Sequence, residues 1–299
     1  MSKLLKAVEK AKRNRRTQED NWIEKGQSHV EPALAGELGD NDDSSGIDQD
    51  KRITTADPLG GAEKCTIPKS FFDDDLVLDE LLLAKNRILT KHSSSSFTDI
   101  YNLLRTQILH RTKKKGHNVL MVTSAMPGEG KTITSINLAI SIAREVDQFA
   151  LLVDTDMRNP SIHKYLGIDV SKGLSDHLLH DIPVHELLVK PGIDKLSYLP
   201  SGDPIRGSTE ILGSPKLQEL IMEMKERYPD RYVIFDCPDL LNAPDALVFS
   251  SYVDGIIFVI EAGKTSREYV KKALGLLEDR NIVGVVLNKT DKESLDVVI

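Results

Sequence analysis

The segment with the clearest capacity for chemistry spans residues 118–132, NVLMVTSAMPGEGKT. Gly130, Lys131 and Thr132 follow a proline- and glycine-rich turn, which is the spacing of phosphate-binding loops, although Ala125 stands where the usual pattern has its first glycine. Glycines let backbone N–H groups converge on phosphate oxygens, the lysine would reach the β- and γ-phosphates, and the threonine hydroxyl would bind Mg²⁺. A glycine-rich turn that merely caps a helix is the alternative. The spacing favours a nucleotide site.

Such a loop needs a strand before it and a helix after it, and the sequence supplies both. Val119–Val122 is an apolar run typical of a buried strand, and residues 133–145 have a helical pattern. The N-terminus of that helix would add its positive end to the site. The residues predicted to contact the nucleotide here are Pro127, Gly128, Glu129, Gly130, Lys131, Thr132 and Ile133.

Carboxylates follow two further predicted core strands. Asp154 and Asp156 lie in LLVDTDMRNP, and Asp236 lies in VIFDCPD, the form of a Walker B motif. Open α/β sheets bind ligands at the carboxyl ends of their parallel strands, so these side chains are expected beside the phosphate loop. Any one of them could instead cap a helix. Because Mg²⁺ keeps several waters and takes one or two carboxylates directly, Thr132 could be a direct ligand while Asp236 acts through water.

Strands alternate with helices along much of the chain, which predicts a mostly parallel sheet covered by helices on both faces, an α/β fold of the P-loop NTPase class. The predicted strands span 119–122, 149–154, 195–199, 232–235, 254–260 and 282–287, and the longer helices 97–109, 133–145, 214–227 and 266–277.

Length, charge and cysteine content limit the remaining possibilities. The 299 residues fit one large α/β domain with an extension, and a net charge of −7 argues against nucleic-acid binding as the main task. Two cysteines, Cys65 and Cys237, suit a reducing compartment rather than a disulfide framework or a zinc site. No run approaches the ~18 apolar residues of a membrane span, and residues 1–16 lack a signal-peptide core, so a soluble, cytoplasmic protein is expected.

Three regions are predicted: a basic amphipathic helix over 1–18, a disordered acidic linker over 19–70 and the nucleotide-binding domain over 71–299. The first could lie on an anionic membrane, dock on a partner, or be a frayed terminus. The second has no apolar period that could form a core. A further basic run, HRTKKKGHN at 110–118, is predicted to be a solvated turn in preference to a phosphate- or lipid-binding patch.

The motifs AMPGEGKT, LLVDTDMRNP and VIFDCPD together resemble those of the bacterial tyrosine kinases of capsule and exopolysaccharide export. The resemblance covers residues 95–289, and its middle motif matches the pattern D-x-D-x-R through Asp154, Asp156 and Arg158. Related partitioning and septum-positioning ATPases carry a lysine where this chain has Met126, which favours the kinases. The resemblance implies a protein-tyrosine kinase that uses ATP and Mg²⁺. It also implies activation by a transmembrane polysaccharide co-polymerase and a peripheral position at the inner face of the membrane through that partner.

The resemblance assigns roles to individual residues as well. The catalytic set would be Lys131, Asp154 and Asp156, the metal-binding set Thr132, Asp156 and Asp236, and the additional nucleotide contacts Arg158 and Asn288. A tyrosine hydroxyl has a pKa near 10 and needs a carboxylate to take its proton, for which Asp154 is the first choice and Asp156 the alternative.

The chain departs from the family pattern at three places, one of which is Asp239, where the family has a second proline after the Walker B aspartate. Its last tyrosine is Tyr269 where the family has a tail cluster, so weak self-modification is expected, and Tyr101 would be an acceptor if it met a neighbouring subunit. The ring-assembly motif E-x-x-R-x-x-R survives in part as Asp99, Asn102 and Arg105, so ring formation by a homo-oligomer is left open.

Two other functions fit parts of the sequence. A P-loop ATPase switch could control a membrane partner without phosphorylating tyrosine, and the absent tyrosine cluster favours it. A GTP-binding protein is suggested by NKTD at residues 288–291, which fits the guanine motif N-K-x-D. Competition between nucleotides would separate ATP from GTP.

Overall fold

The computed structural model describes residues 78–227 and 230–290. The predicted helix 1–18 and linker 19–70 lie outside these residues, as do both ends of the predicted domain 71–299, so the three boundaries stay predictions. Within the described part, no helix is long and apolar enough to cross a bilayer.

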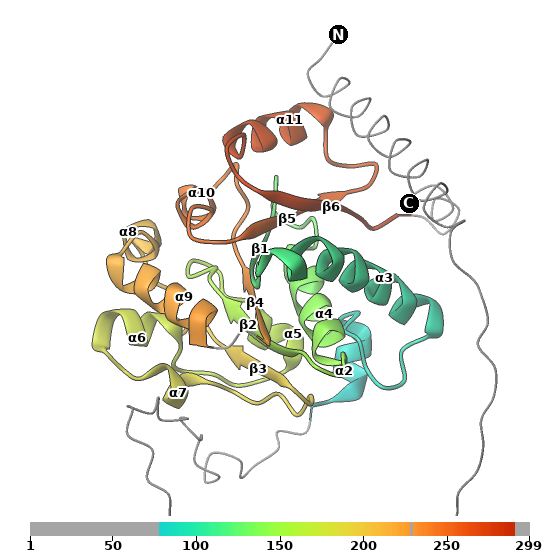
Figure 1. The fold of residues 1–299 in the computed structure, drawn as a ribbon, viewed down its shortest axis with the longest axis horizontal. Helices are drawn as coiled ribbons and strands as arrows, with labels where there is room; N and C mark the ends of the chain where they lie inside the picture. Colours follow the sequence, from blue (N-terminus) through green and yellow to red (C-terminus); the bar gives the residue numbers. More distant parts are fainter. Residues whose placement is uncertain (1–77, 228–229, 291–299) are drawn as a thin grey trace, which may run out of the picture. The chain divides into compact units, whose positions relative to one another are not determined.

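A six-stranded sheet in the order β3-β2-β4-β1-β5-β6 forms the centre of the domain, and every pair of neighbouring strands is parallel (Figure 1). The strands are β1 Val119–Ser124, β2 Phe149–Asp154, β3 Leu196–Leu199, β4 Arg231–Asp236, β5 Gly255–Glu261 and β6 Ile282–Asn288. All carboxyl ends therefore lie at one edge of the sheet, and β1, which the phosphate loop follows, is flanked by β4 and β5. The predicted parallel sheet is present.

Side chains alternate between the two faces of the sheet, as the twofold period of a strand requires. Leu120 and Val122 of β1 join one buried cluster, whereas Val119 and Met121 join the other. Strands buried on both faces read as continuous apolar runs, which is why the sequence indicated parallel rather than half-exposed strands.

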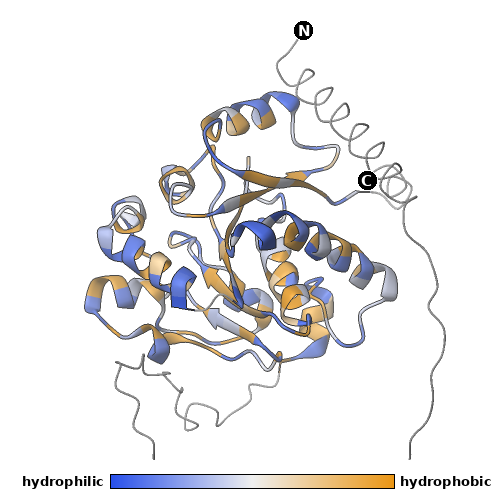
Figure 2. Cartoon of the chain, viewed as in Figure 1, coloured by the Kyte–Doolittle hydropathy of each residue, from blue (hydrophilic) through white to orange (hydrophobic). Residues whose placement is uncertain are grey.

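Helices cover both faces. The first face carries α2 Glu80–Lys85, α3 Ser95–Thr112, α4 Lys131–Ala143 and α5 Ile162–Leu166, and the second α6 Leu174–His180, α7 Val184–Leu187, α8 Ser208–Leu212, α9 Pro215–Arg227, α10 Pro244–Phe249 and α11 Arg267–Leu276. Between α3 and β1 lies a single 3₁₀ turn, η2 Lys113–Lys115. Hydropathy follows this layering, with apolar residues on the strands and the inward faces of the helices (Figure 2).

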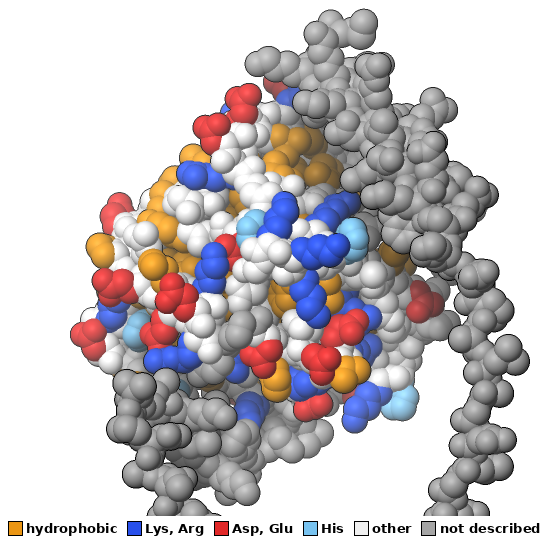
Figure 3. Space-filling view, viewed as in Figure 1, with side chains coloured by type: hydrophobic (Ala, Val, Ile, Leu, Met, Phe, Trp, Pro, Cys, Tyr) orange, Lys and Arg blue, Asp and Glu red, His pale blue; other side chains and the backbone are white. Residues whose placement is uncertain are grey.

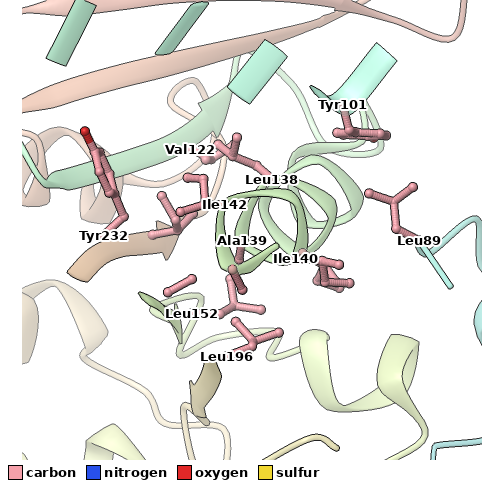
Figure 4. Close-up of a cluster of buried hydrophobic side chains, with 14 of the residues drawn as sticks. Leu89, Tyr101, Val122, Leu138, Ala139, Ile140, Ile142, Leu152, Leu196 and Tyr232 are labelled. Atoms are coloured by element: carbon pink, nitrogen blue, oxygen red, sulfur yellow. The ribbon is translucent and has the colours of Figure 1, made fainter. Parts of the chain in front are cut away.

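Helix α4 fixes the position of the phosphate loop because it is buried on nearly all sides. Its residues Leu138, Ile140 and Ile142 are almost inaccessible to solvent, and Figure 4 shows Leu138 and Ile142 on the side of Val122 of β1 and Ile140 on the side of Leu89. Burial of a side chain of this size contributes about 1.5–3 kcal/mol. The packing holds the first residues of α4, Lys131 and Thr132, at the carboxyl edge of the sheet.

Two short helices, α8 and α10, were not predicted from the sequence. Each lasts little more than one turn, too short for an apolar period to register. Pro244 opens α10, a position where its missing N–H costs nothing. Both helices contribute to the candidate site described next.

Candidate active site

The loop between β1 and α4 has the backbone shape of a phosphate cradle. Gly128 and Gly130 have φ angles of 81° and 97°, in the left-handed region that favours glycine. A Cβ on Gly130 would also come within 2.0 Å of Nδ2 of Asn288. Position 130 must therefore be glycine for both conformational and steric reasons.

Groups from two later strand ends brace this loop from outside. Nδ2 of Asn288 donates to the Glu129 carbonyl at 2.8 Å, and Nζ of Lys289 donates to the Gly128 carbonyl at 2.7 Å. The buried Glu129 carboxylate accepts from the Met126 amide at 2.9 Å and from the Thr265 hydroxyl. The loop shape is thus set by the ends of β5 and β6 as well as by its own glycines.

Lys131 points at the carboxylates of the neighbouring strands. Its Nζ lies 3.0 Å from Oδ2 of Asp156 and 3.9 Å from Oδ2 of Asp236. Burial of the ammonium opposes its charge, but the two carboxylates outweigh that effect and raise the pKa of Lys131 above its usual value. The lysine is therefore permanently cationic at the edge where phosphates would bind.

Asp236 is fully buried at the end of β4 and is held by two hydroxyls of α4. Thr132 donates to its Oδ2 at 2.7 Å, and Ser135 lies 3.0 Å from its Oδ1. Burial raises the pKa of Asp236, and Lys131 and the two hydroxyls act in the opposite direction. Thr132 and Asp236 are thus in direct contact, with Lys131 beside them.

Asp154 is also fully buried, but backbone amides surround its carboxylate. Its Oδ1 accepts from the Asp156 amide at 3.1 Å, and its Oδ2 from the amides of Ser161 and Ile162 at 3.0 and 3.2 Å. Burial, followed by the nearby charge of Asp236, raises the pKa of Asp154 to about 7. The carboxyl both shapes the loop after β2 and has a proton affinity suited to exchange near neutral pH.

Comparison with known proteins decides the family. A family model described as an AAA domain matches residues 117–280. The tyrosine-protein kinase YwqD of Bacillus subtilis (strain 168) is 31% identical over 208 residues, which are 69% of this chain and 86% of that protein. This chain belongs to the bacterial tyrosine-protein kinase family.

Two further comparisons concern the fold of this domain and a longer relative that contains a similar region. A solved structure, the chimerical protein CapA2B2, superposes with a TM-score of 0.64 at 26% identity, covering 72% of this chain and 93% of that one. The succinoglycan biosynthesis transport protein ExoP of Rhizobium meliloti (strain 1021) is 29% identical over 215 residues, which are 70% of this chain but 27% of that protein. The predicted family and the P-loop NTPase fold are confirmed, and this fold implies nucleotide binding.

Arg158 of this kinase-family chain lies in a different setting from the one its motif suggested. Its Nε and Nη2 donate to the two oxygens of the buried Asp245 of α10, at 3.1 and 2.9 Å. Ser208 and Thr209, at the start of α8, also donate to that carboxylate. A nucleotide contact would have to draw Arg158 from this pair, so its predicted role stays a prediction.

The oxygen donors of the site fit magnesium better than a metal held by protein alone. Within residues 78–227 and 230–290, no group of three His, Cys, Asp or Glu side chains is arranged to hold a metal ion. The Thr132 hydroxyl and the carboxylates of Asp156 and Asp236 instead offer the few hard ligands that Mg²⁺ combines with water and substrate phosphates.

Several residues of the site escaped the sequence analysis. Among those that contact predicted site residues are Ser135, Asp245 and Thr265. Ser135 had a detectable signal, since it lies three residues after Thr132 and hence on the same side of the helix. Asp245 and Thr265 reach the site from remote parts of the chain, which no local pattern reveals.

Proposed function

We propose that this chain transfers the γ-phosphoryl group of Mg-ATP to a tyrosine of a protein that controls exopolysaccharide synthesis or export. The observation that carries the proposal is the pairing of Lys131 with Asp156 and Asp236 beside a glycine loop, in a chain of this kinase family. The polysaccharide setting is supported by ExoP, whose name places it in succinoglycan biosynthesis. The kinase relatives favour phosphoryl transfer over an ATPase switch.

Phosphate binding is assigned to the loop amides and Lys131, because catalysis of phosphoryl transfer consists largely of positioning and charge neutralisation. The lysine would exchange part of its ion pair with Asp156 for a phosphate oxygen. Thr132, Asp156 and Asp236 would hold Mg²⁺, which supplies neutralisation of the phosphate charge. The backbone of residues 127–133 would enclose the phosphates, and Asn288 would lie toward the base.

Asp154 is assigned as the base that takes the proton from the tyrosine hydroxyl. Its pKa of about 7 lets the carboxylate accept a proton at neutral pH and release it afterwards. The amides of Asp156, Ser161 and Ile162 hold this carboxylate at the end of β2. Asp156, which is slightly exposed, is the alternative base.

A membrane-protein partner is part of the same proposal. In ExoP the matching region is about a quarter of a longer transport protein, so a domain of this kind can operate within a transport assembly. We assign the present chain a separate transmembrane polysaccharide co-polymerase as activator, a peripheral position on the cytoplasmic side and, with such a partner, a homo-oligomer.

The test is incubation of the full chain with Mg-ATP, alone and with the cytoplasmic tail of a candidate co-polymerase, followed by mapping of phosphotyrosine. The expected result is tyrosine phosphorylation that increases with the partner and disappears in Lys131→Ala. ATP hydrolysis without any phosphotyrosine would support the ATPase switch instead. Stronger competition by GTP than by ATP would contradict the assigned nucleotide.

A further inference from the structure

A compact group of basic side chains lies where α3 ends. His110 and Arg111 belong to the last turn of α3, and Lys113, Lys114 and Lys115 form η2; all five are exposed. We call these five residues the basic turn. Figure 3 shows Lys, Arg and His side chains gathered over this end of α3. Nη1 of Arg111 also donates to the Val283 carbonyl at 2.7 Å, which ties the turn to the edge strand β6.

The basic turn lies at the opposite edge of the sheet from the candidate active site. It leads through Gly116 directly into the start of β1, whereas the phosphate loop follows the end of β1. Six residues of strand at about 3.3 Å each separate the two by roughly 20 Å. A partner bound to the basic turn would leave the nucleotide site open.

The positive charge of the basic turn is not neutralised by ion pairs with carboxylates in the described part of the chain. None of its three lysines forms an ion pair with a described acidic side chain. Two acids precede the strands that flank β1. The carboxylate of Asp254, before β5, is already bound by Lys225 and by the amides of Asn118 and Val119, whereas the exposed Asp230, before β4, forms no ion pair with the lysines of the turn. The negative end of α3 accounts for one or two basic residues in its last turn, but not for three further lysines.

We propose that the basic turn binds the anionic headgroups of a phospholipid membrane. Compact ammonium groups on an exposed turn suit a layer of headgroup phosphates, and each basic side chain near an anionic surface strengthens binding roughly fivefold. The seven Lys and Arg residues within 1–16 would form a second contact on the same surface. The competing occupant is the chain's own acidic segment 37–50, which carries six acids and no base. The proposal does not depend on phosphoryl transfer.

The test uses the full chain and vesicles of phosphatidylglycerol mixed with phosphatidylcholine, with pure phosphatidylcholine as reference. The variant carries Lys113→Glu, Lys114→Glu and Lys115→Glu together. The control carries Lys172→Glu, Lys271→Glu and Lys272→Glu, which change the net charge equally at exposed positions outside the turn. Binding to the anionic vesicles is expected to fall about tenfold or more in the variant and only a few-fold in the control, and to weaken with salt.

Nucleotide binding, measured on the same samples, reports the fold and is expected to be unchanged in both proteins. If the three Lys→Glu substitutions disturb the fold, a variant with Lys→Gln at the same three positions is used in their place. Equal vesicle binding by variant and control would overturn the proposal, as would equal binding to neutral vesicles. A third outcome would also overturn the proposal. If residues 110–116 are protected from hydrogen exchange without vesicles, if salt removes that protection, and if the variant binds vesicles undiminished, the acidic segment 37–50 rather than a membrane occupies the basic turn.

Discussion

The ammonium of Lys131 lies 3.0 Å from Oδ2 of Asp156, so the lysine assigned to phosphate is already paired with a carboxylate from the loop after β2. The pair links two of the three motifs, because Lys131 belongs to the phosphate loop and Asp156 to the loop after β2. Binding of phosphate would replace one anionic partner of the lysine by another.

Lys131→Ala is expected to abolish most ATP affinity, because a phosphate in a water-poor loop would lose its charged partner. The loss should be about 2–3 kcal/mol, typical of a charge-assisted hydrogen bond. Isothermal calorimetry measures it, with the exposed Lys164→Ala as control. Unchanged affinity in Lys131→Ala would refute the assigned phosphate loop.

Asp236→Asn and Asp154→Asn should separate metal binding from proton transfer. The first is expected to weaken Mg²⁺-dependent ATP binding, because Asp236 contacts Thr132 directly. The second is expected to retain binding but lose phosphotyrosine formation. Titrations with and without Mg²⁺ and a transfer assay measure the two effects. If transfer survives in Asp154→Asn, while Asp156→Asn loses transfer but keeps its Mg²⁺-dependent ATP affinity, the base is Asp156.

Gly130→Ala is expected to impair nucleotide binding even though it removes no functional group. The left-handed backbone costs a non-glycine residue about 1–2 kcal/mol, and the added Cβ collides with Asn288. Asn288→Ala removes the collision but not the strain, so the double variant should recover only part of the stability lost by Gly130→Ala. Thermal unfolding of the parent, the two single variants and the double variant gives a double-mutant cycle. If the losses of stability in the two single variants simply add in the double variant, the side chain of Asn288 does not collide with the added Cβ.

Stability should depend on pH through Asp154. Its pKa is about 7 in the fold against an ordinary value of 3.8, so between these values the native state holds a proton that the unfolded chain has lost. The contribution of this bound proton to the free energy of unfolding is therefore complete below about pH 4 and is lost as pH rises through 7. Denaturant titrations at pH 5 to 8 should show a steeper loss in the parent than in Asp154→Asn. Parallel curves would show that the pKa is not raised.

Self-modification should be weak and confined to one described site. Tyr101, Tyr198 and Tyr232 are buried, which removes Tyr101 as the accessible acceptor suggested by its helix. Tyr165 and Tyr252 are partly buried against the two apolar clusters, whereas Tyr269 on α11 is 46% exposed. Burial also raises the pKa of Tyr101, which makes its hydroxyl harder to ionise. Phosphopeptide mapping of the parent and Tyr269→Phe checks this; strong labelling of Tyr101 would contradict it.

Local sequence was sufficient for the fold class and for the residues at each strand end. The apolar runs of β1, β2 and β4 are continuous because both faces of a parallel sheet are buried. Asp154 and Asp236 end β2 and β4, and Lys131 begins the helix after the loop that follows β1. The position of each strand end is short-range information, because a strand ends where its apolar run ends.

Only the tertiary structure decided which of these groups touch. Arg158 pairs with Asp245, Glu129 with Thr265, and the Gly128 carbonyl with Lys289, across separations of 87, 136 and 161 residues. Such partners depend on the order in which strands assemble in the sheet, and the sequence pattern of each strand is compatible with several orders. The sequence predicts that the basic turn is solvated, but only the packing of α3 and β1 shows that the turn lies at the amino edge of the sheet, opposite the phosphate loop.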